Sequence, residues 1–160
     1  MSRREGLPHE GRSSATARQA GPVVTNMTPQ VAWRGPFHTD EVHRLHAEAF
    51  QTRLSTADEW DWEQLVAAHS LGWVVARQGP DLVGFANVLW DGLVHAWIQD
   101  VMVAASGRRL GVGRTVVAEA ADGARRAGCE WLHVDFEPHL RAFYLDACGF
   151  TPSEAGLLRL

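Results

Sequence analysis

Residues 106–117, SGRRLGVGRTVV, join a run of apolar residues to a segment of helical periodicity. Two glycines, Gly111 and Gly113, flank one valine, and two arginines precede them. Beyond the glycines, apolar residues recur at the spacing of an amphipathic helix until Gly128. The stretch therefore predicts a strand over residues 94–103, a glycine-rich turn and a helix.

The glycine-rich turn has the chemistry of an anion site. The first backbone N–H groups of a helix have no intrahelical partner, and they bind anions readily. A phosphate could approach the main chain at Gly111 and Gly113 because glycine lacks a Cβ. Arg108, Arg109 and Arg114 would supply positive charge. The alternative is that the glycines only shape the turn while the arginines are solvated.

Two known phosphate-binding loops fit this turn poorly. A Walker loop needs a lysine after its glycines, and the chain contains no lysine. A dinucleotide-binding fingerprint needs a third glycine where this chain has Val116, although Asp135 lies about 20 residues further on. The Walker loop is therefore excluded and the match to the fingerprint is partial. A nucleotide-binding fold, which would show affinity for NAD or ATP, is a third possibility.

Apolar periodicity and turn signals organise the rest of the chain as a mixed α+β protein. Strands are predicted over residues 31–34, 71–77, 82–90, 131–136 and 157–160, and helices over residues 39–50, 58–69 and 138–147. Turn residues at 78–81 and 91–92 separate neighbouring strands, so an antiparallel meander leads into one β-α-β unit. Residues 1–26 lack periodicity and are expected to form a disordered arm before a single domain over residues 27–160.

Composition excludes several classes of protein. Hydrophobic residues make up 46% and charged residues 21% of the chain, as in a globular protein, and no run approaches the roughly 20 apolar residues of a membrane span. The net charge of −4 provides no basic field, so we expect neither nucleic acid nor a membrane as a partner. Cys129 and Cys148 adjoin apolar segments and suit buried thiols in a reducing compartment, which predicts a cytoplasmic protein.

The motif RRLGVG at residues 108–113, directly after DVMV at residues 100–103, resembles the signature of the GNAT superfamily of acyl-CoA-dependent N-acetyltransferases. The hairpin LGWVVARQGPDLVGFANVLWD resembles the second and third strands of that family, and AFYLDACGF resembles its closing helix. The similarity covers about residues 31–160. It implies a three-layer α+β fold, in which a central, mostly antiparallel twisted sheet with one splayed parallel strand pair is flanked by about four helices.

The resemblance also implies acetyl-CoA as co-substrate and no metal ion. The backbone at residues 101–103 would pair with the pantetheine arm, because splayed strands leave polar groups free, and backbone amides across residues 108–115 would hold the diphosphate. The implied cofactor-binding residues are Val101, Met102, Val103, Arg108, Arg109, Leu110, Gly111, Val112, Gly113, Arg114, Thr115 and Glu137. Glu137 stands where asparagine is common in the family, which weakens one expected contact.

Tyr144 matches the family tyrosine that lies near the thioester sulfur, so the resemblance implies that Tyr144 protonates the leaving thiolate. Tyr144 and Gly149 are five positions apart, one more than in many family members, and one residue turns a helix by about 100°. An extra residue early in the helix would bring Leu145 to the tyrosine's position. We favour an extra residue in the turn before Gly149, which preserves the direction of Tyr144.

Acyl transfer also needs a group that takes a proton from the amine, because an amine is mostly protonated at pH 7. Asp100 lies in an apolar strand directly before residues 101–103, so burial would raise its pKa and make it a general base. In the alternative interpretation, backbone amides or an arginine satisfy this carboxylate. Asp135, Glu137 and Asp91 are the other candidates, and a backbone N–H after Asp100 would stabilise the oxyanion.

The acceptor pocket is expected between the first two predicted helices and the hairpin of the third strand. Its predicted residues are Phe50, Arg53, Trp60 and Trp90. Seven tryptophans are many for a chain of this size, and Trp60 and Trp62 cannot both be buried on one helix face. The competing interpretation is that these rings pack in the core. His43 and His46, three residues apart, favour a solvated or capping role over zinc binding.

These observations predict a cytoplasmic N-acetyltransferase that moves an acetyl group from acetyl-CoA to a primary amine of an unidentified small molecule or protein, by direct transfer in a ternary complex. The alternative is a catalytically inactive module that binds or senses acyl-CoA. The sequence leaves open the acceptor, the acyl-chain preference and the oligomeric state, a homodimer being one arrangement.

Overall fold

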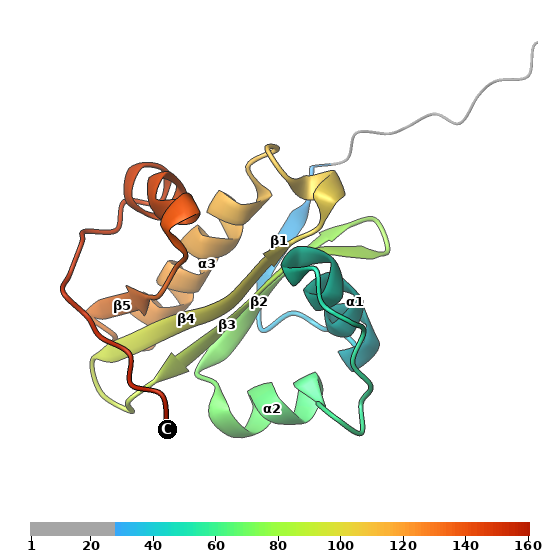
Figure 1. Cartoon of the computed structure of the whole chain (residues 1–160), viewed down its shortest axis with the longest axis horizontal. Helices are drawn as coiled ribbons and strands as arrows, with labels where there is room; N and C mark the ends of the chain where they lie inside the picture. Colours follow the sequence, from blue (N-terminus) through green and yellow to red (C-terminus); the bar gives the residue numbers. More distant parts are fainter. Residues whose placement is uncertain (1–27) are drawn as a thin grey trace, which may run out of the picture.

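A computed structural model describes residues 28–160, so the arm expected over residues 1–26 lies outside the described residues. Within them, five strands form one sheet in the order β1-β2-β3-β4-β5 (Figure 1). The strands are β1 Gln30–Trp33, β2 Gly72–Gln78, β3 Asp81–Trp90, β4 His95–Val103 and β5 Trp131–Val134. Neighbours from β1 to β4 are antiparallel, whereas β4 and β5 are parallel, which confirms the α+β sheet with one parallel pair.

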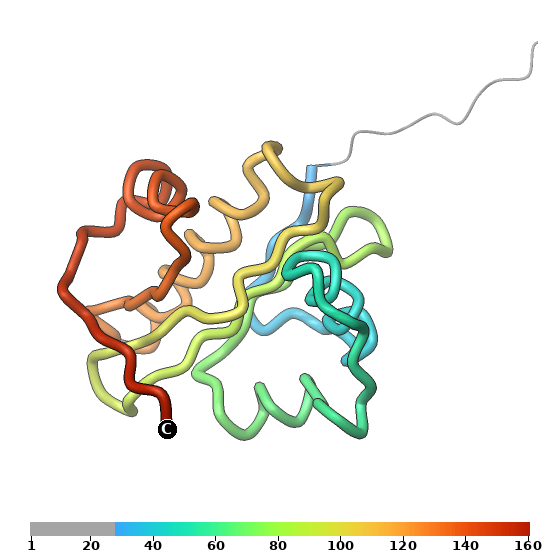
Figure 2. Tube along the Cα trace, in the orientation of Figure 1, coloured from blue at the N-terminus to red at the C-terminus, as the bar shows by residue number. Residues whose placement is uncertain are grey.

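Helices cover both faces of this sheet. The α-helices of the described residues are α1 Thr39–Phe50, α2 Trp62–His69 and α3 Val112–Arg126, and the shorter turns are Ala105–Gly107, Pro138–Leu140 and Phe143–Ala147. α3 lies on one face, and α1 and α2 lie on the other (Figures 1 and 2). The expected three-layer arrangement is therefore confirmed. None of the helices in residues 28–160 is long and apolar enough to cross a membrane.

β3 is buried on both faces because it lies in the middle of the sheet. On the face of α1 and α2, the Phe85 ring meets the Trp62 ring edge-on at a centroid distance of 5.7 Å. On the opposite face, a Cβ on Gly84 would lie 3.2 Å from side-chain atoms of Val112 and Val116 in α3. This two-sided apolar burial holds the sheet as the middle layer.

The N-termini of α1 and α2 are tied to each other by capping side chains. The Asp61 carboxylate accepts the N–H of Gln64 at 3.0 Å, which caps α2, and it also accepts the Thr39 hydroxyl at 3.0 Å. In return, the N–H of Thr39 donates to the Glu63 carboxylate at 3.0 Å. These bonds satisfy donors at the helix ends and anchor the connection over residues 51–61 at its far end.

The predicted boundaries agree closely with the structure, apart from the start of the second helix and the C-terminal part of the chain. The second helix begins at Trp62 rather than at residue 58, and the closing segment is a 3₁₀ turn followed by a π-helical turn. The strand predicted over residues 157–160 is wrong, because these exposed residues follow an irregular path outside the sheet (Figure 2). A strand needs a hydrogen-bonding neighbour, and a local leucine pattern does not supply one.

Trp33 lies in a slot between the sheet and α3 that two glycines leave open. A Cβ on Gly72 of β2 would lie 2.2 Å from the Trp33 ring, and a Cβ on Gly123 of α3 would lie 2.4 Å from it. Real Cβ atoms do not approach so closely, so these glycines set the distance between α3 and the sheet.

We expect Gly123→Ala to lower the free energy of unfolding by about 1–3 kcal/mol, because the added methyl group overlaps Trp33 even though alanine favours helix. Denaturant titration of the purified variant measures the change. The substitution should be less destabilising in a Trp33→Leu background, where the overlapping ring is gone. Equal losses in both backgrounds would show that Trp33 does not limit this contact.

Candidate active site

β4 and β5 separate at a fork beyond their last pair. The parallel ladder ends at Ile98 opposite Val134, while β4 continues to Val103. In the described part of the chain, residues 99–103 therefore have no strand beside them on the β5 side, and backbone groups on that edge need partners from elsewhere.

β4 is bent just beyond the fork. Its register with β3 shifts between Phe85 and Asn87, and Asp100 has a φ of +52°, in the left-handed region. A bulge of this kind bends the strand and redirects the side chains next to it. Asp100 consequently leaves the regular alternation of the strand where β4 and β5 diverge.

A cavity of about 860 Å³ opens at the fork. It is bounded by the end of β4, the turn before α3, the segment after β5 and the C-terminal end of α1. The predicted site residues that line it are Phe50, Val101, Val103, Arg108, Arg109, Gly111, Gly113, Arg114, Glu137 and Tyr144. The fold thus brings together segments that are distant in the sequence.

Other predicted cofactor residues lie outside the cavity lining. Met102 and Val112 are buried in the core, and Leu110 and Thr115 are exposed beside the turn. Their side chains do not face the cavity, so any contact with a ligand there would come from their backbone groups.

Several lining residues were not anticipated from the sequence. They are Ala49, Gln51, Gly107, His139, Leu140, Phe143 and Ala147. Leu140, Tyr144 and Ala147 recur at helical spacing. This spacing alone predicts that Leu140 and Ala147 lie on the same face as Tyr144.

Gly111 and Gly113 serve the turn before α3 in different ways. Gly111 has a φ of +82°, which favours glycine, and a Cβ there would meet nothing within 4 Å. Among residues 28–160 no side chain caps α3, so N–H groups of its first turn have no intrahelical or capping partner there. A Cβ on Gly113 would lie 3.2 Å from the Phe143 ring, so this glycine lets the helix pack on that ring. Open main-chain donors are therefore available at the cavity beside Gly111.

Three arginines add positive charge to the same end of the cavity. Arg108, Arg109 and Arg114 all line it and are exposed. Arg108 donates through Nε to the carbonyl of Val103 at 3.3 Å, and none of the three pairs with a carboxylate within the described part of the chain. This end of the cavity is suited to an anionic ligand.

The extra residue of the closing segment is absorbed by a π-helical turn, Phe143–Ala147. The N–H of Cys148 donates to the carbonyl of Phe143 at 3.0 Å, five residues back instead of the four of an α-helix. Tyr144 consequently lines the cavity, and Leu145 does not. Tyr144 therefore faces the cavity despite the longer spacing to Gly149.

The Tyr144 ring is buried among other aromatic rings. Its centroid lies 5.0 Å from that of Phe136, nearly parallel, and 5.8 Å from that of Phe150. Burial raises the pKa of the Tyr144 hydroxyl to about 12. The phenol therefore keeps its proton at neutral pH and can donate it.

Asp100 is a half-buried carboxylate at the bend of β4. Within residues 28–160, neither a backbone amide nor an arginine bonds to it, and burial raises its pKa, an effect that a positive charge on His46 would oppose. Asp91, another candidate base, instead accepts the N–H groups of Leu93 at 2.7 Å and His95 at 3.2 Å in the β3–β4 turn. Of these two carboxylates, Asp100 is the one whose pKa is raised, and it directly precedes Val101 of the cavity lining without lining the cavity itself.

The predicted acceptor residues are placed in different parts of the molecule. Phe50 lines the cavity from the end of α1. Arg53 donates to both oxygens of Glu59, at 2.9 and 2.6 Å. Trp60 lies in the α1–α2 connection outside the lining, and Trp90 lies at the end of β3 near the β3–β4 turn. The structure therefore brings Phe50, but not Trp90, to the fork.

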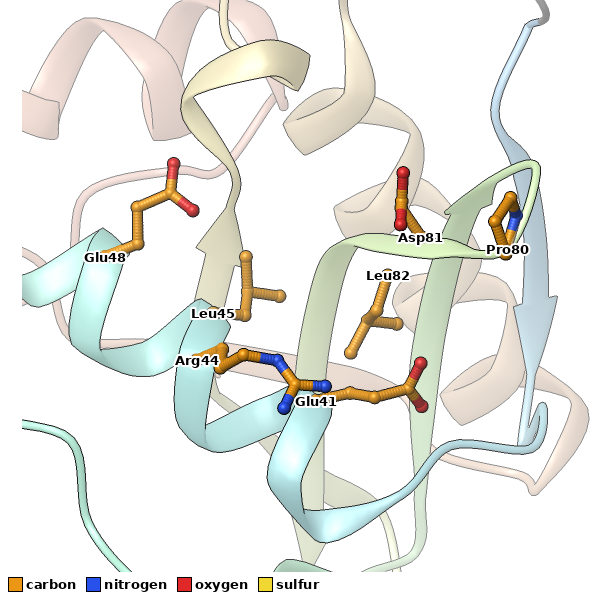
Figure 3. A pocket seen from close by; sticks show the side chains of 7 residues that line it. All are labelled: Glu41, Arg44, Leu45, Glu48, Pro80, Asp81 and Leu82. Atoms are coloured by element: carbon orange, nitrogen blue, oxygen red, sulfur yellow. The ribbon is translucent and has the colours of Figure 1, made fainter.

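A second, smaller cavity of about 150 Å³ lies between α1 and the β2–β3 turn (Figure 3). Two of its three acidic side chains are engaged: Glu41 pairs with both terminal nitrogens of Arg77 at 2.9 and 2.7 Å, and Glu48 accepts the N–H of Ala105 at 2.6 Å. These contacts join α1 to the sheet. Across the described residues, no three His, Cys, Asp or Glu side chains are grouped as a metal site requires.

Comparison with known sequences shows a family match over most of the chain. The model of the acetyltransferase (GNAT) family matches residues 39–150. Among curated proteins, a probable glucosamine 6-phosphate N-acetyltransferase 2 of Oryza sativa subsp. japonica is 42% identical over 54 residues, which are 34% of this chain and 32% of that protein. The match thus spans about a third of the length of that relative.

Solved structures with the same fold include several acetyltransferases. A putative acetyltransferase of Agrobacterium tumefaciens str. C58 superposes with a TM-score of 0.69 at 23% identity, covering 82% of this chain and 99% of that one. AAC(6')-Iy in complex with the bisubstrate analog CoA-S-monomethyl-acetylneamine gives 0.68 at 18% identity, covering 84% and 98%. Glucosamine-6-phosphate N-acetyltransferase of Arabidopsis thaliana gives 0.63 at 17% identity, covering 82% and 98%. At these identities the likeness concerns the fold.

We expect Asp100→Asn to raise the melting temperature at pH 7. Because the folded-state pKa of Asp100 is raised, ionisation destabilises the native state, and this loss develops as the pH rises above the ordinary value of 3.8. The gain over the parent should therefore vanish at pH values below 3.8, which melting curves across the pH range measure.

Asp91→Asn is the matched control, because its carboxylate accepts backbone N–H groups in a turn and its pKa is lowered. This variant should be less stable than the parent at pH 7, and the difference should shrink as the pH falls below 3.8. A pH-independent gain in Asp100→Asn would attribute the effect to the left-handed backbone alone, which asparagine tolerates well.

Proposed function

Because this chain belongs to the GNAT family of acetyltransferases, we propose that it transfers an acetyl group from acetyl-CoA to a primary amine, directly and within a ternary complex. The observation that carries this proposal is the cavity at the fork, which has free main-chain donors at the start of α3 and a protonated tyrosine in its wall. Family membership alone identifies the chain as an acetyltransferase.

The diphosphate of acetyl-CoA suits the turn before α3. N–H groups at a helix start carry partial positive charge, and the open space at Gly111 lets a phosphate come close to them. Arg108, Arg109 and Arg114 add formal charge at this end of the cavity. The pantetheine arm would run along residues 101–103 and bond to backbone groups that have no strand beside them.

Acetyl transfer moves two protons off the acceptor nitrogen, and the fork carries a group for each step. Asp100 would take one proton from the ammonium group, so that the neutral amine attacks the thioester carbonyl carbon. A C–N bond forms, the C–S bond breaks, and Tyr144 would protonate the departing thiolate. The second proton from the nitrogen restores the phenol, and Asp100 releases the first to solvent. A backbone N–H after Asp100 would stabilise the oxyanion by about 3 kcal/mol.

Glucosamine 6-phosphate is the first acceptor to test, because the curated rice relative is named for it. A panel of primary amines accompanies it in an assay that follows CoA thiol release from acetyl-CoA. Release that depends on an amine supports the proposal. Saturable binding of acetyl-CoA without release above background for every amine would identify an inactive acyl-CoA-binding module instead.

We expect Gly111→Glu to weaken acetyl-CoA binding by about 100-fold, or roughly 3 kcal/mol, because a carboxylate then lies where the diphosphate binds. Isothermal titration calorimetry measures the dissociation constant. Gly128→Glu is the control, because Gly128 at the other end of α3 also has a positive φ, +95°, and open space around its Cβ position. Equal affinities in the two variants would place the diphosphate elsewhere.

Tyr144→Phe should leave the affinity for acetyl-CoA and the melting temperature unchanged but lower kcat by about 10²–10⁴-fold, because only the hydroxyl group, the proton donor, is lost. Steady-state thiol release under saturating substrates gives kcat. A variant with the parent's kcat would show that the thiolate leaves without help from Tyr144.

A further inference from the structure

A cluster of rings adjoins the cavity on the side of α1. We call it the aromatic wall and define it by His46, Phe50, Trp60 and Trp62. The centroid of the His46 ring lies 4.8 Å from that of Phe50, 5.7 Å from Trp60 and 6.0 Å from Trp62. Phe50 also lines the cavity, together with Val101 directly after Asp100. Phe50 therefore joins the cavity to the aromatic wall, whose other three rings lie outside the cavity lining.

The aromatic wall is held from behind while its front is exposed. Trp60 stacks on Trp62 at 5.0 Å with 13° between the planes, and the fully buried Trp62 packs against Phe85. The carbonyl of Trp60 accepts a hydrogen bond from Nε2 of His43 at 2.7 Å. Nevertheless, 39% of Trp60 and 48% of Phe50 are exposed. Exposed rings that are fixed in place beside a cavity are typical of ligand-binding surfaces.

The charges near the aromatic wall suit a cation. Arg53 is the only basic residue in the connection over residues 51–61, and Glu59 engages its guanidinium group. The Asp100 carboxylate directly precedes Val101, which lines the cavity together with Phe50 of the wall, and it accepts no hydrogen bond from the described residues. An ammonium group would be attracted to Asp100 and to the ring faces, whereas a phosphate would be repelled by Asp100.

We infer that the acceptor is a cationic primary amine on an aromatic or similarly apolar body, which packs against Phe50 and Trp60 and directs its ammonium group to Asp100. This inference rests on the proposed acetyl transfer. The inferred acceptor differs from the substrate for which the rice relative is named, because that substrate bears a phosphate. A ring on the acceptor would meet the wall in an offset or edge-on contact, the geometries that aromatic pairs prefer.

The test compares 2-phenylethylamine with glucosamine 6-phosphate as acceptors for the full chain at saturating acetyl-CoA. We expect kcat/KM for 2-phenylethylamine to be at least about tenfold higher. Trp60→Ala should raise KM for this amine about tenfold and leave the dissociation constant of acetyl-CoA unchanged. Trp90→Ala is the matched control, because Trp90 is exposed to a similar extent, 42%, but lies outside the aromatic wall. It should change neither quantity.

A further variant tests the charge argument. Glu59→Gln removes the carboxylate that engages Arg53, so it should raise kcat/KM for glucosamine 6-phosphate several-fold without improving that for 2-phenylethylamine. Faster turnover of glucosamine 6-phosphate than of 2-phenylethylamine by the parent chain would overturn the inferred acceptor class while supporting acetyl transfer. Equal effects of Trp60→Ala and Trp90→Ala would overturn the role of the wall.

Calorimetry measures the binding of 2-phenylethylamine to the chain loaded with CoA. This measurement distinguishes a failure of the proposed acetyl transfer from a failure of the inferred acceptor class. Suppose that Trp60→Ala weakens this binding but that no amine causes CoA release. This result would support the aromatic wall as the amine site and contradict the proposed transfer. Absence of binding and of turnover with 2-phenylethylamine, alongside turnover of another amine, would contradict the acceptor class alone.

Discussion

The structure depends on main-chain hydrogen-bonding groups that find no strand or capping partner within residues 28–160. β4 continues past Ile98 after β5 has ended at Val134, and no described side chain caps the start of α3. Both sets of groups border one cavity. Unpaired backbone donors and acceptors are tolerated where solvent or a ligand reaches them, so this cavity combines a strand edge with a helix start.

Contacts far from the fork hold these two borders in place. Trp33, enclosed by Gly72 and Gly123, determines how closely α3 approaches the sheet and therefore where the start of α3 lies. On the opposite face, the bonds between Thr39 and Asp61 and the stack of Trp60 on Trp62 fix the α1–α2 connection. The cavity consequently has two rigid sides of different chemistry. One side carries main-chain donors and arginines, and the other carries Phe50, whose ring contacts His46 of the aromatic wall.

Burial acts on both ionisable groups proposed for acetyl transfer. It raises the pKa of Tyr144 to about 12, which keeps the phenol protonated, and it raises the pKa of Asp100 above its ordinary value. A carboxylate that takes up protons more readily is a better base near neutral pH, and a protonated phenol is an acid. The same desolvation thus supports opposite roles, because the two groups begin from very different pKa values.

The sequence by itself determined the order of the elements, the helix over residues 39–50 and the glycine-rich turn, because periodicity, caps and φ preferences act over a few neighbouring residues. Tertiary structure decided the rest. A π-helical turn stabilised by its surroundings aimed Tyr144 at the cavity, Glu59 engaged Arg53, and the length of β3 placed Trp90 away from the fork. The leucines at residues 157–160 found no strand to pair with. Each of these outcomes depends on which remote segments meet in space, and no local pattern encodes that.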